Sequence, residues 1–180
     1  DTAAHNTVVV DGESQAAYRG RLRWSQAYRA RPHHRVTSES MDYVEGTHDG
    51  YTRLASPVRH CRGVLFMKPD YWLLRDELRG EGPHQIDRFF HLAPEFDPTV
   101  LGNRVSARDA EGYGLLLIAL EDDALTTHLW TDGDQPEDGW GATGYGQRRR
   151  AATFSFRTRM TRSTVFHTLL VPFRGTPPSI

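Results

Sequence analysis

The stretch 41–94, MDYVEGTHDGYTRLASPVRHCRGVLFMKPDYWLLRDELRGEGPHQIDRFFHLAP, decides the fold class. It contains three short apolar or alternating segments at residues 58–67, 71–80 and 86–94. Lys68-Pro69-Asp70 lies between the first two segments, and residues 80–83 (GEGP) lie between the second two. Segments of this kind, separated by proline, glycine and aspartate, indicate strands joined by tight turns. The stretch therefore predicts a three-stranded meander, preceded by a strand that ends near Gly46.

The middle segment of this meander alternates in character along its length. One side carries Tyr71, Leu73, Arg75 and Glu77, and the other carries Trp72, Leu74, Asp76 and Leu78. Because successive side chains of a strand point to opposite faces, one face is clearly more apolar. This pattern is typical of a half-buried strand in an antiparallel sheet.

The rest of the chain carries similar strand signals. Further strands are expected at residues 7–11, 100–107, 113–120, 125–131, 151–159 and 164–173. Residues 132–150 read as a glycine-rich and then arginine-rich loop, and residues 19–35 as an exposed, arginine-rich stretch. No internal repeat and no amphipathic helix interrupts this series. About ten strands with regular turn signals predict a single all-β domain, an antiparallel β-sandwich with few or no helices.

Composition excludes several classes of protein. The 180 residues suit one domain, and the formal net charge of −1 provides no overall field for nucleic acid or a membrane surface. No apolar run approaches the roughly 18 residues that span a bilayer. The single cysteine, Cys61, excludes an internal disulfide and a multi-cysteine zinc site. Of the 22 basic residues only Lys68 is lysine, which we attribute to genomic base composition.

Two catalytic patterns can be set aside. Residues 139–144 (GWGATG) match the three-glycine motif of dinucleotide-binding domains. No predicted helix follows it, however, and threonine stands at position 164, where an acidic residue would be needed to bind the ribose. No nucleophile-elbow motif of a serine hydrolase is present. The nine histidines form no compact ligand set within one strand. Two of them, His5 and His48, stand in polar local motifs, AHNT and THDGY.

These two motifs, with their neighbours, resemble the heparinase II/III-like family of polysaccharide lyases. The matching segments keep the family's order, cover nearly the whole chain and are HNTVVVDG (5–12), GTHDGY (46–51), HCR (60–62), WLLRDEL (72–78), RFFHLAP (88–94) and GWGATGYG (139–146). Each segment is weak alone, and together they are a strong signal. Cys61 departs from the family, which usually has arginine there.

The resemblance implies a two-part enzyme with an N-terminal α/α toroid and a β-sandwich. Residues 1–180 would be most of that sandwich, and a chain that opens with DTAAHNTVVVDG is expected to be a fragment without the first strands. Family members cleave uronic-acid-containing acidic polysaccharides by β-elimination. Their catalytic tyrosine and asparagine–histidine pair lie on the toroid, so no catalytic residue is expected in this chain. The sandwich would form one wall of the substrate cleft and support the toroid.

The resemblance also suggests roles for a few residues. His5 is expected as one ligand of a structural zinc ion whose other ligands lie upstream; the alternative is a strand histidine bonded to backbone. His48, Asp49 and Tyr51 are candidates for the substrate-binding face, although Asp49-Gly50 is also an ordinary turn, which the residues favour. This chain alone is expected to be metal-free or to bind metal weakly. Family members mostly act in the periplasm or outside the cell.

Two other functions share the same fold. A non-catalytic carbohydrate-binding module would place Trp24, Trp130 and Trp140 on one exposed face. A structural half-domain would need a partner at an exposed sheet edge and could form a homodimer through it.

Overall fold

The computed structural model describes the chain except for residues 18, 21–22, 25–27, 121–123 and 132–139. The described residues contain one 3-10 turn, η1 (Thr2–Ala4), and no α-helix. Their strands are β1 (Val8–Val10), β2 (Ala30–Thr37), β3 (Met41–His48), β4 (Arg59–Met67), β5 (Tyr71–His91), β6 (Asp97–Leu101), β7 (Arg104–Arg108), β8 (Tyr113–Ala119), β9 (Thr126–Trp130), β10 (Trp140–Gly144), β11 (Gln147–Arg150) and β12 (Thr153–Arg174). The prediction of an all-β antiparallel fold is confirmed.

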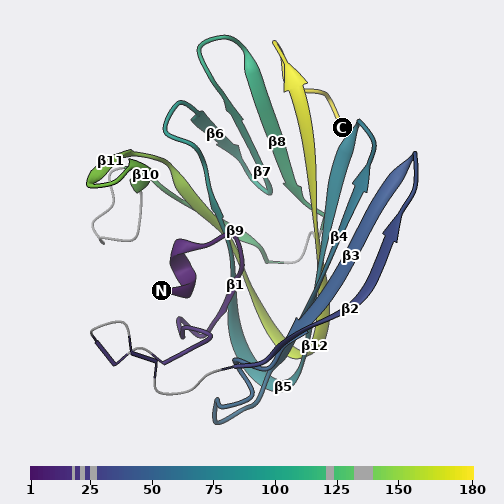
Figure 1. Ribbon diagram of the computed structural model, residues 1–180, viewed down its shortest axis with the longest axis vertical. Coiled ribbons are helices and arrows are strands. Elements are labelled where there is room, and N and C mark those ends of the chain that lie inside the picture. The colour runs from purple at the N-terminus through teal and green to yellow at the C-terminus, as the bar shows by residue number, and fades with distance from the viewer. Residues whose placement is uncertain (18, 21–22, 25–27, 121–123, 132–139) are drawn as a thin grey trace.

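Ten of these strands form one antiparallel sheet (Figure 1). Its main path is β2-β3-β4-β5-β12-β8-β7-β6, while β1 pairs with β5 and β9 pairs with β12. The strands β10 and β11 form a separate hairpin. The second part of the predicted loop 132–150 is therefore wrong, because residues 140–144 and 147–150 pair around Gly146, whose positive φ permits the tight turn. The first part, residues 132–139, lies outside the described residues.

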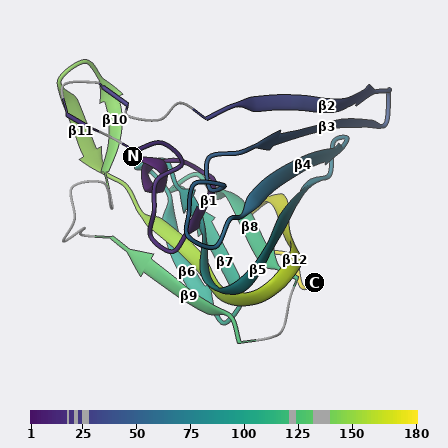
Figure 2. The same cartoon turned by 90° about the horizontal axis from the view of Figure 1, so that it is seen from below.

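The two long strands β5 and β12 connect the two layers of the sandwich. They pair with each other from Thr153 opposite His91 to Leu170 opposite Trp72. The first half of β5 also pairs with β4 and its second half with β1, while β12 pairs first with β9 and then with β8. Figure 2 shows both strands curving strongly through the molecule. The two layers are thus halves of one sheet whose central strands turn the corner between them.

This geometry corrects two boundaries predicted from sequence. Residues 80–83 were expected to be a turn between two strands, and residues 160–163 a break between the last two. Both positions lie inside continuous strands, where pairing shifts between Met160, Arg162 and Thr164 and where Gly82 has a φ of 91°. Bulges bend a strand without ending its ladder, so these signals mark the corner of the sheet. The expected strand 100–107 is instead a hairpin, β6–β7, that turns at Gly102.

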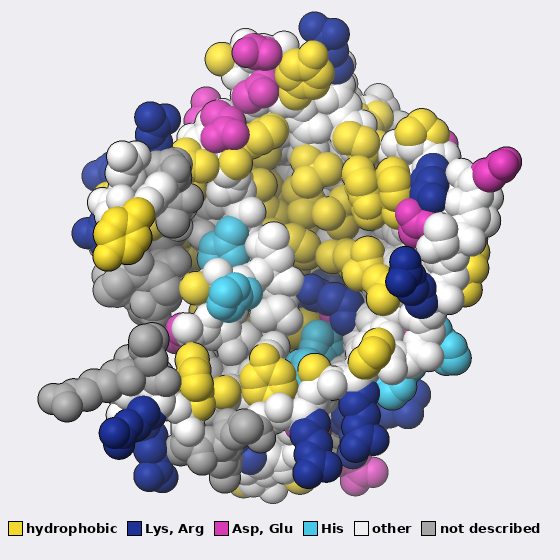
Figure 3. Space-filling model, in the orientation of Figure 1, with side chains coloured by type: hydrophobic (Ala, Val, Ile, Leu, Met, Phe, Trp, Pro, Cys, Tyr) yellow, Lys and Arg dark blue, Asp and Glu magenta, His cyan; other side chains and the backbone are white. Residues whose placement is uncertain are grey.

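Among the described residues, two apolar clusters form the core. The first packs β1 against the bend and consists of Val8, Val10, Tyr51, Val58, Leu78, Ile86, Met160 and Phe166. The second lies under β8 and the start of β12 and consists of Phe90, Val105, Leu117, Ala119, Phe154 and Phe156. Figure 3 shows further apolar side chains lining a hollow between the β2–β4 and β6–β8 arms. The core therefore fixes the bend and leaves one concave face open.

The strand β2 forms one edge of the large sheet. All eight of its residues are exposed, it contains Pro32, and its pairing with β3 shifts between Pro32 and His34. Proline, bulges and charged side chains are devices that oppose pairing between sheet edges. The β2 edge therefore carries features that oppose edge-to-edge pairing. Among the described residues no helix has the length and apolarity to cross a bilayer.

Candidate functional site

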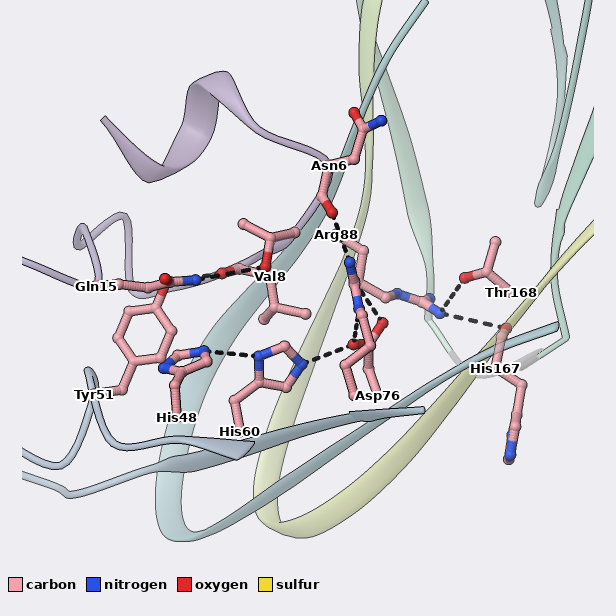
Figure 4. Close-up of polar contacts among 12 residues, drawn as sticks. Asn6, Val8, Gln15, His48, Tyr51, His60, Asp76, Arg88, His167 and Thr168 are labelled. Carbon is pink, nitrogen blue, oxygen red and sulfur yellow. Dashed lines mark hydrogen bonds and ion pairs between the residues drawn. The ribbon is translucent and has the colours of Figure 1, made fainter. Parts of the chain in front are cut away.

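A row of hydrogen-bonded polar side chains crosses β3, β4 and β5 (Figure 4). His48 Nε2 lies 3.0 Å from His60 Nδ1, and His60 Nε2 lies 2.7 Å from Asp76 Oδ1. Arg62 then binds both oxygens of Asp76, through Nε at 2.6 Å and Nη2 at 2.9 Å. His60 and Asp76 are almost completely buried. We refer to His48, His60, Asp76 and Arg62 as the polar row.

The strand register brings these side chains together. Arg62 lies directly opposite Asp76 in the β4–β5 pair, and His48 lies directly opposite His60 in the β3–β4 pair. His60 and Arg62 are two residues apart, so they point to the same face of β4. Arg62 Nη1 also donates to the carbonyl oxygen of Asn6 at 2.6 Å. The polar row thus ties the HNT motif to the centre of the sheet.

The hydrogen bonds determine the tautomers of the two histidines. The Gly50 N–H lies 3.2 Å from His48 Nδ1 and donates to it. The proton of a neutral His48 must therefore be on Nε2, which donates to His60 Nδ1. His60 Nε2 then carries its own proton and donates to Asp76. In this arrangement each ring proton is already used in an internal bond.

Burial and neighbouring charges shift the pKa values in this row. Burial lowers the pKa of His48 to about 4, with a further lowering from His60. Burial alone would raise the pKa of Asp76, but Arg62 and the hydrogen bonds from His60 and Arg62 outweigh it and hold that pKa well below its usual range. The row therefore contains a fixed negative charge on Asp76 and a histidine that stays neutral at pH 7.

Sequence reasoning did not identify Asp76, His60 or Arg62 as a unit. A signal for it was present, because Asp76 stands on the more apolar side of its strand, between Leu74 and Leu78. A carboxylate on a buried face needs a cationic or hydrogen-bonding partner. The strand register that supplies Arg62 and His60 is the information the sequence lacks.

Of the three residues predicted to bind substrate, His48 and Asp49 line one cavity, whereas Tyr51 is buried. Asp49 forms a turn, since its carbonyl oxygen accepts from Thr52 N, and its Oδ1 accepts from Arg29 N at 2.6 Å. The side chain of Tyr51 is fully buried, and its hydroxyl donates to Val8 O at 2.7 Å. His48 contacts Tyr51 edge-to-face, with ring centroids 5.5 Å apart. Tyr51 therefore holds the 49–58 loop against β1 and does not face solvent.

Replacing Tyr51 with phenylalanine should lower the free energy of unfolding by about 1–2 kcal/mol, because Val8 O loses a buried donor. Urea denaturation of the protein would measure this loss. Tyr113→Phe is the matched control, since Tyr113 is 47% exposed. Equal stability of both variants would contradict the bracing role of the Tyr51 hydroxyl.

His5 is exposed beside a cavity of about 660 Å³. The lining residues include His5, Gln15, Trp24 and Tyr28. Within the described ranges, no three histidine, cysteine, aspartate or glutamate side chains gather closely enough to hold a metal ion. Structural zinc requires about four ligands, so the residues present do not by themselves fit zinc.

A second cavity, of about 430 Å³, is separated from the His5 cavity by the contact between the rings of Tyr28 and His48. Tyr28, which lines the His5 cavity, contacts His48 edge-to-face with centroids 5.7 Å apart, and His48 lines the second cavity. The lining of this second cavity is mostly basic and consists of Arg29, Arg31, His33, Thr47, His48, Asp49, Arg59 and Arg79.

Comparisons with known proteins agree with this architecture. The structure is similar to a heparan sulfate lyase, HepC from Pedobacter heparinus, with a TM-score of 0.78 and 20% sequence identity over 98% of this chain. It is also similar to a heparinase III, with a TM-score of 0.72 and 16% identity over 96% of this chain. The chain spans about a quarter of the length of these structures, 25% and 24% respectively. No curated protein sequence matches it.

The family comparison covers almost the whole chain. Residues 1–175 match the model of the heparinase II/III-like C-terminal domain. The order of the motifs in the sequence and the bent antiparallel sheet lead to the same assignment. The chain belongs to the heparinase II/III-like family and represents its C-terminal domain.

Proposed function

We propose that this domain forms one wall of the substrate cleft of a polysaccharide lyase. The enzyme would cleave uronic-acid-containing acidic polysaccharide by β-elimination, with an α/α toroid outside these residues providing the other wall. The family match over residues 1–175 is the observation that carries this proposal. The similar folds of a heparan sulfate lyase and a heparinase III support it.

In this proposal the chemistry is supplied mainly from outside this chain. β-Elimination needs a group that neutralises the uronate carboxylate, a base for the C5 proton and an acid for the leaving oxygen. In the polar row both ring protons are engaged in internal bonds, and His48 has a lowered pKa. The polar row is therefore better suited to holding the cleft wall in shape than to transferring protons.

The cavity beside His5 offers a surface for sugar rings. Trp24 is 50% exposed and Tyr28 is 43% exposed, and both line it. Ligand sites combine apolar or aromatic walls with a few polar groups. The polar residues of this lining are Asp1, Thr2, His5, Thr7 and Gln15. Replacing Trp24 with alanine should weaken binding of an acidic oligosaccharide by about tenfold, because a stacking surface is lost. Calorimetric titration would measure this change, and an unchanged affinity would exclude Trp24 from the binding surface.

The central test is lyase activity, followed as the absorbance of the unsaturated uronate product. The protein at its full native length and the 180-residue chain should be compared on a panel of acidic polysaccharides. Activity in the longer protein alone is the expected result. Activity in the 180 residues alone would contradict the proposal that the catalytic groups lie mainly outside this chain. The histidines described above would then be the candidates for a complete site.

A non-catalytic carbohydrate-binding module is the second candidate. Exposed Trp24 favours it, and Trp140 on β10 is 38% exposed. Trp130 differs, because it stacks on Phe89 and His128 at centroid distances of 5.7 and 5.9 Å. Oligosaccharide binding without cleavage by the full-length protein would favour this candidate over the lyase.

Three further properties remain predictions for the full-length protein. His5 would be one ligand of a zinc ion only if residues outside this chain supply the others. The location would be periplasmic or secreted. A homodimer, if one forms, would use a surface other than the protected β2 edge. Metal analysis, cell fractionation and light scattering of the full-length protein would test them.

A further inference from the structure

The basic cavity of about 430 Å³ is built by residues that are far apart in the sequence. Arg29 precedes β2 and Arg31 lies on it, while Arg59 begins β4 and Arg79 lies within β5. Among the described residues, four arginines and one acidic residue, Asp49, line this space. Figure 3 shows basic side chains, in dark blue, gathered along the lower edge of the face that it draws.

Two of these arginines are held against each other by the sheet. Arg59 lies directly opposite Arg79 in the antiparallel β4–β5 pair, and both are exposed. Like charges in directly opposite positions are unfavourable. Arg79 Nε is compensated by Glu77 Oε1 at 2.6 Å, whereas Arg59 forms no ion pair within the described part of the chain. An anion between the two would relieve this repulsion.

The acidic groups beside the cavity offset only part of its positive charge, since Asp49 lines it and Glu77 pairs with Arg79. The Asp49 carboxylate accepts from the backbone N–H of Arg29, so its Oδ1 is already used by the main chain. His33 Nε2 lies 2.6 Å from Thr47 Oγ1. Protection of a sheet edge explains Arg31 on β2 but not Arg59 and Arg79, which lie on interior strands.

We propose that this cavity is a binding subsite for an oxyanion, a sulfate or carboxylate group of an acidic glycan. Guanidinium groups recognise such oxyanions through paired, charge-assisted hydrogen bonds. The subsite lies beyond the Tyr28–His48 contact and is separate from the His5 cavity. The glycan as source of the anion rests on the proposed function, whereas the oxyanion site follows from the four arginines alone.

Inorganic sulfate is the first probe, measured as the shift in Tm of the full-length protein against chloride at equal ionic strength. Sulfate stabilises many proteins non-specifically, so the comparison needs matched variants. The variant R59Q/R79Q should lose most of the sulfate-specific shift, with at least about tenfold weaker binding. The control R108Q/R149Q removes the same charge from two exposed arginines on β7 and β11 and should retain the shift. Equal shifts in all three proteins, or equal losses in both variants, would overturn the proposal.

Two oligosaccharides then identify the source of the anion. A heparin-derived tetrasaccharide and a non-sulfated oligouronate are titrated into wild type and R59Q/R79Q. Dependence on Arg59 and Arg79 for the sulfated ligand alone assigns sulfate, and dependence for both ligands assigns carboxylate. No dependence for either ligand overturns the glycan subsite. Lyase activity is measured separately, so activity without this dependence removes the subsite only, and dependence without activity removes the proposed lyase only.

Discussion

Replacing Asp76 with asparagine should lower the free energy of unfolding by about 3–5 kcal/mol at pH 7. The substitution leaves Arg62 and the buried His60 without their anionic partner, and breaking a buried ion pair from one side costs about this much. In a domain of this size the expected fall in Tm is about 10 °C. Urea and thermal denaturation of both proteins would measure the two quantities.

The exposed Asp97→Asn on β6 is the matched control and should leave stability nearly unchanged. The pH dependence of stability tests the Asp76 carboxylate in a second way. Because the folded-state pKa of Asp76 is depressed, its contribution is present above the unfolded pKa of about 4 and is lost as pH falls towards the folded pKa. D76N should lack that part of the acid destabilisation. A variant as stable as wild type would show that the polar row does not brace the sheet.

Stability should also fall by up to about 3 kcal/mol as pH falls from 6.5 to 4, because of His48. The unfolded histidine takes up a proton near pH 6.5, while burial lowers the folded pKa to about 4. Between these values the unfolded state binds more protons, so stability rises with pH and the full contribution is present above pH 6.5. Asp49 and Asp76 act in the opposite direction, and Arg62 acts with burial.

The variant His48→Gln should flatten the stability profile across this pH window. His34→Gln is the control, since His34 is an exposed histidine on β2, and it should follow the wild-type profile. Urea midpoints at several pH values between 4 and 7.5 would give both curves. A wild-type profile in H48Q would mean that protonation of His48 does not cause this pH dependence.

Local sequence signals predicted the strands well but not their continuity. Alternation in residues 71–78 and the Lys68-Pro69-Asp70 turn correctly located β4 and the start of β5. Gly80 and Gly82 resembled a hairpin turn, because glycine permits both a turn and a bulge. Only the partner strand distinguishes the two, and β12 lies about 80 residues further along the chain.

The candidate site was predictable only in part for a related reason. The motif AHNT drew attention to His5, and THDGY drew attention to His48, because both are local patterns. The register of β4 against β5 places Arg62 directly opposite Asp76 and Arg59 directly opposite Arg79. Register follows from side-chain packing over the whole sheet, which a single sequence does not display.

The central position of β12 also constrains how the protein is made. Among the described strands β12 is the last to leave the ribosome, yet it joins the β2–β5 half to the β6–β8 half. Until it emerges, the nascent chain presents β5 and β8 as unpaired edges, which are sites for mispairing and chaperone binding. The large sheet must therefore close after synthesis of β12, and its distant β5–β12 pairing predicts slow folding, in the range of milliseconds to seconds.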